Sequence, residues 1–162
     1  MDLNRQQFTK DIGGENLIIE TSNLAEQTNA AAMATYGGTT VLATVVMEDR
    51  DSGTDYMPLT VDYEEKFYAA GKILGSRYVR REGRPSEEAV LSGRLVDRTI
   101  RPLFDKRIRH PIQVVATVLS YDGENDPDFV ALMAASTALA ISDIPWGGPV
   151  SGVSVSKIDD KF

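Results

Sequence analysis

Two apolar stretches rich in β-branched residues limit the fold most strongly. They read T-T-V-L-A-T-V-V-M and I-Q-V-V-A-T-V-L-S, and they span Thr39–Met47 and Ile112–Ser120. Such short runs of valine, threonine and isoleucine are typical of strands rather than of helices. Gly37 and Gly38 precede the first run and a charged segment, 48–51, follows it. We therefore expect two strands here, the first of them buried.

Further strands are predicted on either side of these two. Segments Gln7–Ile12 and Leu17–Thr21 flank G-G-E-N, where glycine permits the turn of an opening hairpin. Met57–Tyr63 alternates sufficiently to be another strand, and Val150–Lys157 is expected to be one more. The alanine-rich segment Asn29–Tyr36 is compatible with either a helix or a strand.

Two helices are indicated by their start signals. Ser86 is a good N-terminal cap, Glu87 and Glu88 follow in the first turn, and Pro102 ends this helix. A second helix begins at Asp126-Pro127-Asp128 and runs to about residue 142. With 162 residues and 42% hydrophobic content, the chain can bury one sizeable core, so a single globular domain is expected.

The charge of the chain is distributed unevenly. Between Gly71 and His110 there are eleven basic and five acidic residues, a local charge of +6, whereas the remainder carries −13 and the net charge is −7. Most of these bases are arginines, whose planar donors suit phosphate. Gly71, Gly75, Gly83 and Pro85 make the first part of this window a loop. A polyanion bound at one face is the expected ligand.

The loop carries arginines next to an aromatic ring, in the order R-Y-V-R-R, with Arg84 shortly after. This combination can hold a single nucleic-acid strand by its phosphates while a base stacks on the ring. The alternative is a solvated loop whose arginines pair with Glu82, Glu87 and Glu88, since exposed ion pairs contribute only ~0 to 1 kcal/mol. The residues alone leave both interpretations open.

The first helix continues the basic surface. Arg94, Arg98 and Arg101 follow at i, i+4 and i+7, which places at least the first two on one face. Like charges on one stripe repel each other unless an anion lies against them. The alternative is that Asp97 pairs with Arg101 or Arg94 and the stripe is a solvated surface. Because the stripe follows the arginine loop directly, we favour one continuous surface that tracks phosphates.

Several kinds of site are excluded or disfavoured. The chain has no cysteine, so it has no disulfide, thiolate metal site or cysteine nucleophile, and its one histidine, His110, is expected in a loop without a catalytic role. No apolar run is long enough to cross a bilayer and no signal peptide precedes the first strand, so we expect a cytoplasmic protein.

An acidic cluster precedes the second helix; it comprises Asp122, Glu124, Asp126 and Asp128. A calcium loop would need glycine and glutamate where this chain has Pro127 and Met133. The cluster instead lies at a helix N-terminus, the place where a free phosphate would otherwise bind. We expect its own carboxylates to fill that place electrostatically.

Three long runs resemble a known family. They are Y-A-A-G-K-I-L-G-S-R-Y-V-R-R-E-G-R-P-S-E, R-L-V-D-R-T-I-R-P-L-F and D-P-D-F-V-A-L-M-A-A-S-T-A-L-A-I-S-D-I-P-W-G-G-P-V. The chain is similar to the first ribonuclease PH-like core domain of the bacterial polynucleotide phosphorylases, from the opening hairpin to about Ser156. The resemblance implies an α/β (α+β) ribonuclease PH-like domain of the ribosomal S5 domain 2-like type, in which helices pack on a mixed sheet. This domain is expected to span residues 1–162 and to be incomplete at its C-terminus.

The resemblance also implies an activity. Members of the family are 3′-to-5′ exoribonucleases of mRNA degradation that use inorganic phosphate and release nucleoside diphosphates, with magnesium as their metal. They form homotrimeric rings that thread single-stranded RNA and can join an RNA-degradation complex in the cytoplasm. Neither DNA nor a membrane is expected as a partner.

The family's functional residues carry over only in part. Tyr78, Arg80 and Arg81 fall on its aromatic-aromatic-Arg-Arg channel loop, with Val79 in place of the second aromatic residue. The complete set of RNA-binding residues predicted here is Tyr78, Arg80, Arg81, Arg84, Arg94, Arg98 and Arg101.

In this family the catalytic carboxylates and the phosphate-binding serines belong to a second copy of the domain. The corresponding serine position here reads G-E-N-D-P-D. We therefore expect no catalytic residue and no metal ligand in this chain. It would bind RNA for the longer enzyme and supply contacts between the subunits of its ring. The alternative is a stand-alone, noncatalytic RNA-binding or assembly module of the same fold.

Overall fold

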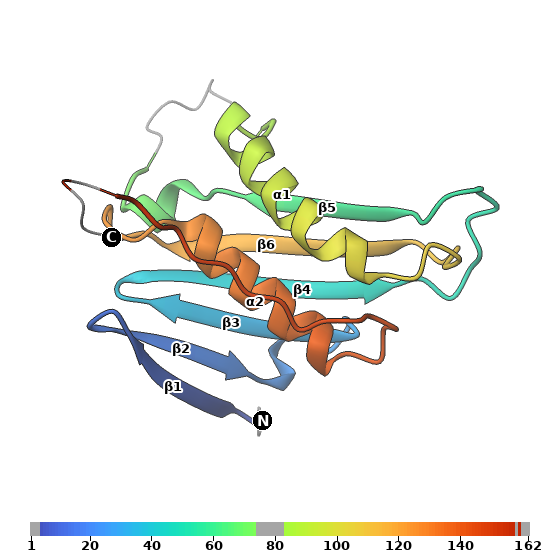
Figure 1. Ribbon diagram of the computed structural model, residues 1–162, viewed down its shortest axis with the longest axis horizontal. Helices are drawn as coiled ribbons and strands as arrows, with labels where there is room; N and C mark the ends of the chain where they lie inside the picture. Colours follow the sequence, from blue (N-terminus) through green and yellow to red (C-terminus); the bar gives the residue numbers. More distant parts are fainter. Residues whose placement is uncertain (1–3, 74–82, 158, 160–162) are drawn as a thin grey trace.

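A six-stranded mixed sheet with two helices on one face forms the framework of the chain (Figure 1). The computed structural model describes residues 4–73, 83–157 and 159. The strand order is β1-β2-β3-β4-β6-β5, antiparallel throughout except for the parallel pair β5 and β6. The strands are β1 Gln6–Ile12, β2 Glu15–Thr21, β3 Ala30–Tyr36, β4 Thr39–Met47, β5 Leu59–Glu64 and β6 Ile112–Ser120. The helices are α1 Glu87–Ile100 and α2 Pro127–Ile141, with 3₁₀ turns at Asn23–Ala25, Phe67–Ala70 and Arg101–Leu103.

Most of the predicted elements are confirmed. The opening hairpin, the two β-branched strands and both helices form where their signals place them. The strand expected over Met57–Tyr63 begins at Leu59, and the ambiguous alanine-rich segment forms β3. The mixed sheet packed by helices is thus confirmed, and no helix among the described residues is long and apolar enough to cross a bilayer.

Strand β6 holds the sheet together because it pairs with β4 on one side and with β5 on the other. Its alternate residues Ile112, Val114, Ala116 and Val118 are buried on the face that carries the helices. Alternation of this kind is expected of a strand with one covered and one open face. The loop from β5 to β6 contains α1, which packs on β5.

Small residues bring helix α2 close to the sheet. Ala32 and Ala34 of β3 and Ala43 of β4 are fully or almost fully buried. Their counterparts on the helix, which have no exposed surface, are Ala131, Ala134, Ala135 and Ala138. An alanine adds only one methyl group to the backbone, so helix and sheet can approach closely and leave little room for larger side chains.

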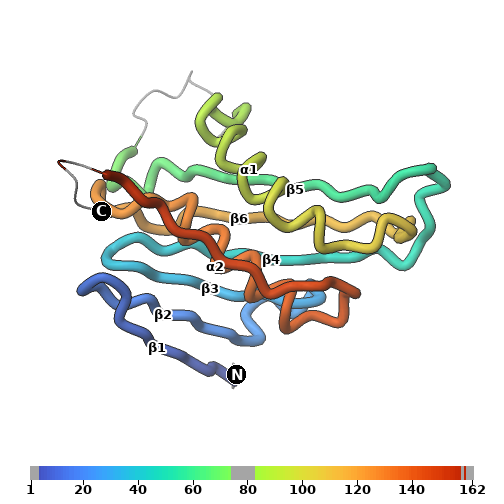
Figure 2. Tube along the Cα trace, in the orientation of Figure 1, coloured from blue at the N-terminus to red at the C-terminus, as the bar shows by residue number. Residues whose placement is uncertain are grey.

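The strand predicted over Val150–Lys157 is wrong. Among the described residues this segment pairs with no strand; it runs as an extended chain across α2 (Figures 1 and 2). The Val150 N–H donates to the Ser136 hydroxyl at 2.9 Å, and a side chain at Gly152 would meet Leu132 at 3.1 Å. Val153 and Val155 are 73% and 66% exposed, so their alternation marks no buried face.

The reason for this path lies in α2. The helix is apolar nearly all round, and a helix of that kind needs cover on more than one side. The sheet covers one side, and the segment after α2 covers part of the other. The segment V-S-V-S-K therefore covers α2 and does not form a strand.

Helix α1 begins as its cap predicts. The Ser86 hydroxyl accepts the Ala89 N–H at 3.0 Å, and the helix ends one residue before the 3₁₀ turn that contains Pro102. Gly93 allows α1 to lie against β5, since a side chain there would stand 3.4 Å from Tyr63 Cβ. The indole N–H of Trp146 donates to the Ile100 carbonyl at 3.1 Å and fixes the helix end.

Asp122 connects the turn between β3 and β4 to the loop before α2. Its carboxylate accepts the Gly38 N–H at 2.8 Å, the Thr39 hydroxyl at 3.1 Å and the Asn125 N–H at 2.8 Å. These hydrogen bonds, those from Asn125 first, hold the pKa of Asp122 well below its usual range. The loop that leads into α2 is thus fixed by one ionised group.

The close contact between α2 and the sheet can be tested by overpacking. We expect Ala43→Leu to lower the free energy of unfolding by about 1–3 kcal/mol, because the buried alanine layer has no space for the added carbons. Thr44→Leu, one residue further on the half-buried open face, should change it by less than about 0.5 kcal/mol. Denaturant unfolding of both variants measures the difference; equal effects would contradict close packing at Ala43.

The Asp122 connection predicts a pH-dependent stability. Since the folded pKa is lowered, its contribution is fully present above the unfolded pKa of about 4 and is lost as pH falls below it. Asp122→Asn should therefore lower the thermal midpoint at neutral pH and differ less from the parent in acid. Asp49→Asn, an exposed acid without a partner among the described residues, is the control. A midpoint difference for Asp122→Asn that stays constant from neutral pH to acid would show that its ionisation has no part in the connection.

Candidate functional site

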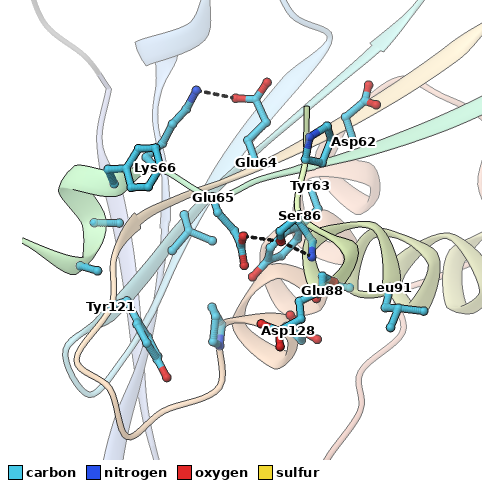
Figure 3. A pocket seen from close by; sticks show the side chains of 18 of the residues that line it. Asp62, Tyr63, Glu64, Glu65, Lys66, Ser86, Glu88, Leu91, Tyr121 and Asp128 are labelled. Carbon is cyan, nitrogen blue, oxygen red and sulfur yellow. Dashed lines mark hydrogen bonds and ion pairs between the residues drawn. The ribbon is translucent and has the colours of Figure 1, made fainter. Parts of the chain in front are cut away.

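A cavity of about 1370 Å³ opens where the end of β5 meets the N-termini of both helices (Figure 3). Its walls come from three parts of the chain: β5 with the 3₁₀ turn after it, the start of α1, and the loop before α2. Six acidic residues and three basic ones line it: Asp62, Glu64, Glu65, Glu88, Asp126 and Asp128 against Lys66, Lys72 and Arg84. The lining is therefore acidic in balance.

The floor of this cavity contains a buried hydroxyl and a half-buried carboxyl. Tyr63 is 4% exposed, and its hydroxyl makes no hydrogen bond of ordinary geometry with any described residue. Burial, followed by the nearby Asp128 carboxylate, raises the pKa of Tyr63, so this group stays protonated. Burial is also the main reason why the pKa of Asp128 is raised, and the negative charges of Asp126 and Glu65 add to it.

The wall is ordered by the cap of α1. The Ser86 hydroxyl that caps the helix donates in turn to the Glu65 carboxylate at 2.8 Å, as the dashed lines in Figure 3 show. Lys66 and Glu64 form an ion pair at 3.2 Å beside it. One serine therefore fixes both the start of α1 and the position of a wall carboxylate.

Both helices direct their N-termini toward this cavity, and both carry acidic residues there. Glu87 and Glu88 lie in the first turn of α1. The carboxylate of Asp126 accepts the Asp128 N–H at 2.9 Å and so caps α2. Helix N-termini attract anions, but here the anions are the protein's own carboxylates, as the sequence indicated for the cluster before α2. A free phosphate would meet negative charge.

The predicted arginines lie in different places. Arg94 and Arg98 are exposed on the outer face of α1 and make no hydrogen bond or ion pair with any described residue. Arg101 is bound internally: it contacts the Asp97 carboxylate at 2.5 Å and donates to the Leu59 carbonyl at 3.0 Å. Of the two pairings considered for Asp97, the one with Arg101 forms and the one with Arg94 does not.

The remaining predicted residues are Arg84, Tyr78, Arg80 and Arg81. Arg84 is exposed at the edge of the cavity. Tyr78, Arg80 and Arg81 lie outside the described residues. The structure therefore brings two of the predicted arginines onto one face and places a third at the cavity.

Apolar side chains surround the arginines of α1. Val90, Leu91 and Leu95 are 48%, 63% and 47% exposed. An uncovered face of leucine, valine and arginine is typical of surfaces that contact other macromolecules. The sequence showed these residues, but not that the helix would turn them outward.

The described residues contain no cluster of three metal-ligating side chains. Within 4–73, 83–157 and 159 no three His, Cys, Asp or Glu side chains stand close enough together to hold a metal ion. His110 lies in a loop, where its Nδ1 is 3.0 Å from the Glu48 carbonyl oxygen. The acidic cavity is thus a set of separated carboxylates.

Tyr63, Ser92 and Glu65 line the cavity but were not singled out in the sequence. Tyr63 is one residue of an ordinary strand pattern and Ser92 lies within a helix. Their relation to Asp128 depends on how α1, β5 and α2 pack, which no local signal contains.

A known protein family and several curated proteins are similar to this chain in sequence. A sequence profile of the 3' exoribonuclease family, domain 1, matches residues 14–145. The polyribonucleotide nucleotidyltransferase of Exiguobacterium sibiricum is 51% identical over 162 residues, which is all of this chain and 22% of that protein. The enzyme of the same name from Borrelia duttonii is 53% identical over 152 residues, or 93% of this chain and 21% of that protein. The chain therefore spans about a fifth of the length of the curated relatives it matches.

Solved structures share the fold at low sequence identity. Rice (Oryza sativa) Rrp46 superposes with a TM-score of 0.57 at 14% identity, covering 91% of this chain and 59% of that one. A chain of the Archaeoglobus fulgidus exosome, solved with RNA bound to the active site, gives a TM-score of 0.56 at 21% identity and covers 87% of this chain and 52% of its own length. The ribonuclease PH-like fold predicted from the sequence is confirmed. Because the family profile matches most of its length, the chain belongs to the 3' exoribonuclease family and contains domain 1 of that family.

Proposed function

We propose that the chain is the RNA-holding first unit of a polyribonucleotide nucleotidyltransferase, a phosphate-dependent 3′-to-5′ exoribonuclease that degrades mRNA. Relatives of that name are 51% to 53% identical over nearly the whole chain. The observation that carries the RNA-holding role is the exposed pair Arg94 and Arg98, which has no partner among the described residues.

The geometry of this pair suits phosphates. Residues at i and i+4 of a helix are neighbours on one face, so two guanidinium groups lie side by side and repel each other until an anion approaches. Since neither group has to leave an ion pair, binding of an RNA phosphate needs no internal contact to be broken. Arg101 differs in this respect because Asp97 already neutralises it.

Phosphorolysis itself is assigned to other parts of the whole protein. The attacking phosphate is an anion, and six acidic residues, among them Glu65, Asp126 and Asp128, outnumber the three basic ones in the lining of the cavity at the helix N-termini. Magnesium is the metal that we propose for the whole enzyme, and the described residues of this chain contain no cluster of three metal-ligating side chains. This chain would hold RNA while the bond is cleaved elsewhere.

The proposal includes the wider setting of the enzyme. The whole protein would act in the cytoplasm as a homotrimer on single-stranded RNA, consume inorganic phosphate and release nucleoside diphosphates. Val90, Leu91 and Leu95 support an assembly contact, because they leave apolar surface uncovered beside the arginines of α1. An RNA-degradation complex is a further partner in this proposal.

A second function is a noncatalytic RNA-binding or assembly module of the same fold. The acidic cavity favours it, since six acidic residues against three basic ones give its lining a charge that on balance repels phosphate. The two functions differ in the whole protein: the first requires phosphate-dependent release of nucleoside diphosphates from RNA, whereas the second requires RNA binding or assembly without that release.

RNA binding by α1 can be measured through its salt dependence. We expect Arg94→Ala with Arg98→Ala, introduced into the whole protein, to weaken RNA binding and to flatten the plot of log affinity against log salt by about 1.4, or ~0.7 for each lost phosphate contact. Lys10→Ala with Arg50→Ala removes the same charge from exposed sites outside the basic window and is the control. An unchanged slope together with an altered oligomeric state would assign this face to protein contacts instead.

Because catalysis is assigned to other parts of the protein, we predict that the chain by itself has no phosphorolytic activity. Purified residues 1–162 should release no nucleoside diphosphate from poly(A) in the presence of phosphate and magnesium, while the whole protein should. Chromatography of the products measures this release. Phosphorolysis by the isolated chain would contradict the assignment of catalysis to other parts.

A further inference from the structure

Two aromatic rings are exposed at the edge of the cavity, where the chain leaves β5 and β6. Phe67 begins the 3₁₀ turn after β5 and Tyr121 follows β6 directly. Both line the cavity, and they are 41% and 42% exposed. Neither ring packs against another aromatic ring among the described residues. Uncovered aromatic surface at the edge of a cavity is typical of a place where a ligand or partner binds.

The backbone around the two rings is already ordered. The Lys72 N–H donates to the Phe67 carbonyl at 3.0 Å and closes the turn. The Tyr121 N–H donates to the Ala69 carbonyl at 2.9 Å, which ties the end of β6 to the same turn. A ligand would therefore meet rings on a fixed backbone, which lowers the entropic cost of binding.

Two exposed cations accompany the rings. Lys72 comes just after the turn and Arg84 just before α1, and both line the same cavity. Neither side chain makes a hydrogen bond or ion pair with any described residue, whereas Lys66 is paired with Glu64. Aromatic faces beside cationic side chains are typical of sites for single-stranded nucleic acid, because bases stack on the rings while the cations neutralise phosphates.

The edge of the cavity continues onto the outer face of α1. Leu91 lines the cavity (Figure 3) and is 63% exposed. Arg94 and Arg98 follow it at i+3 and i+7, on the same side of the helix. A strand bound by these arginines can therefore reach the two rings along one surface. This continuity favours RNA over a protein as the occupant.

We propose that Phe67 and Tyr121 stack RNA bases at the edge of the cavity, and that Lys72 and Arg84 bind the phosphates of the same nucleotides. This site rests on the RNA-holding function proposed above and extends it from α1 to the ends of β5 and β6. Since acidic residues outnumber basic ones in the lining, the phosphates stay at the exposed edge and only the uncharged bases enter. Such a site accepts every base, because each base has a flat face.

Fluorescence anisotropy of the whole protein with oligoadenylate, and with an abasic ribose-phosphate chain of equal length, tests this proposal. We expect Phe67→Ala with Tyr121→Ala to weaken oligoadenylate binding by about tenfold or more and to leave binding of the abasic chain unchanged. The salt dependence should also stay the same, because no charge is removed. Tyr68→Ala removes a 55% exposed ring of the same turn that does not line the cavity, so it should bind oligoadenylate like the parent. Tyr121→Phe keeps the ring and should do the same.

The arginines of α1 separate this proposal from the function on which it rests. Arg94→Ala with Arg98→Ala should flatten the salt dependence for both ligands. If it does so while Phe67→Ala with Tyr121→Ala binds oligoadenylate like the parent, the stacking site is overturned and RNA holding by α1 stands. An equal loss of affinity for both ligands in the aromatic variant would also overturn stacking. Unchanged RNA affinity with an altered oligomeric state would assign the rings to protein contacts.

A second measurement needs no variant. An oligonucleotide that contains 5-iodouridine, irradiated in complex with the whole protein, crosslinks to aromatic rings that stack on the modified base. We expect crosslinked peptides that contain Phe67 or Tyr121, identified by mass spectrometry. Crosslinks found only in other peptides would contradict the proposal.

Discussion

The close approach of α2 to the sheet is the contact on which the rest of the structure depends. Alanines on both surfaces, such as Ala43 of β4 and Ala135 of α2, let the helix lie directly against β3 and β4. Since α2 is apolar nearly all round, its outer side has to be covered as well, and the segment after Gly148 crosses it. The same contact fixes where α2 begins, because Asp122 ties the preceding loop to the turn between β3 and β4.

The position of that helix start determines the character of the cavity. With α2 held against the sheet and α1 held against β5 by Gly93, both helix N-termini and the end of β5 meet at one place. Helix N-termini are ready anion sites, and this chain fills them with Asp126 and Glu88. The two helix N-termini would otherwise attract phosphate, but with these carboxylates they repel it. Arg94 and Arg98, which have no partner among the described residues, lie instead on the outer face of α1, where a polyanion can reach them.

The limits of sequence prediction follow from the range of each signal. The caps at Ser86 and Asp126 and the β-branched run of β6 are local, and each produced the element it predicts. Val150–Lys157 has the local pattern of a strand, but it lies across α2. Its packing against that helix outweighs the local pattern. The sequence left open whether Asp97 pairs with Arg101 or with Arg94, and only the structure distinguishes the two pairings. Tyr63 could not be found in advance because its position beneath a cavity depends on three elements distant in the sequence.

The central claim is that this chain holds RNA on α1 and leaves phosphate chemistry to other parts of the protein. The most direct measurement is a structure of the whole protein in complex with oligoadenylate and inorganic phosphate. The claim predicts RNA phosphates in contact with Arg94 and Arg98, and no phosphate in the cavity lined by Tyr63 and Asp128. A phosphate bound in that cavity, or RNA bound with both arginines far from its backbone, would contradict it.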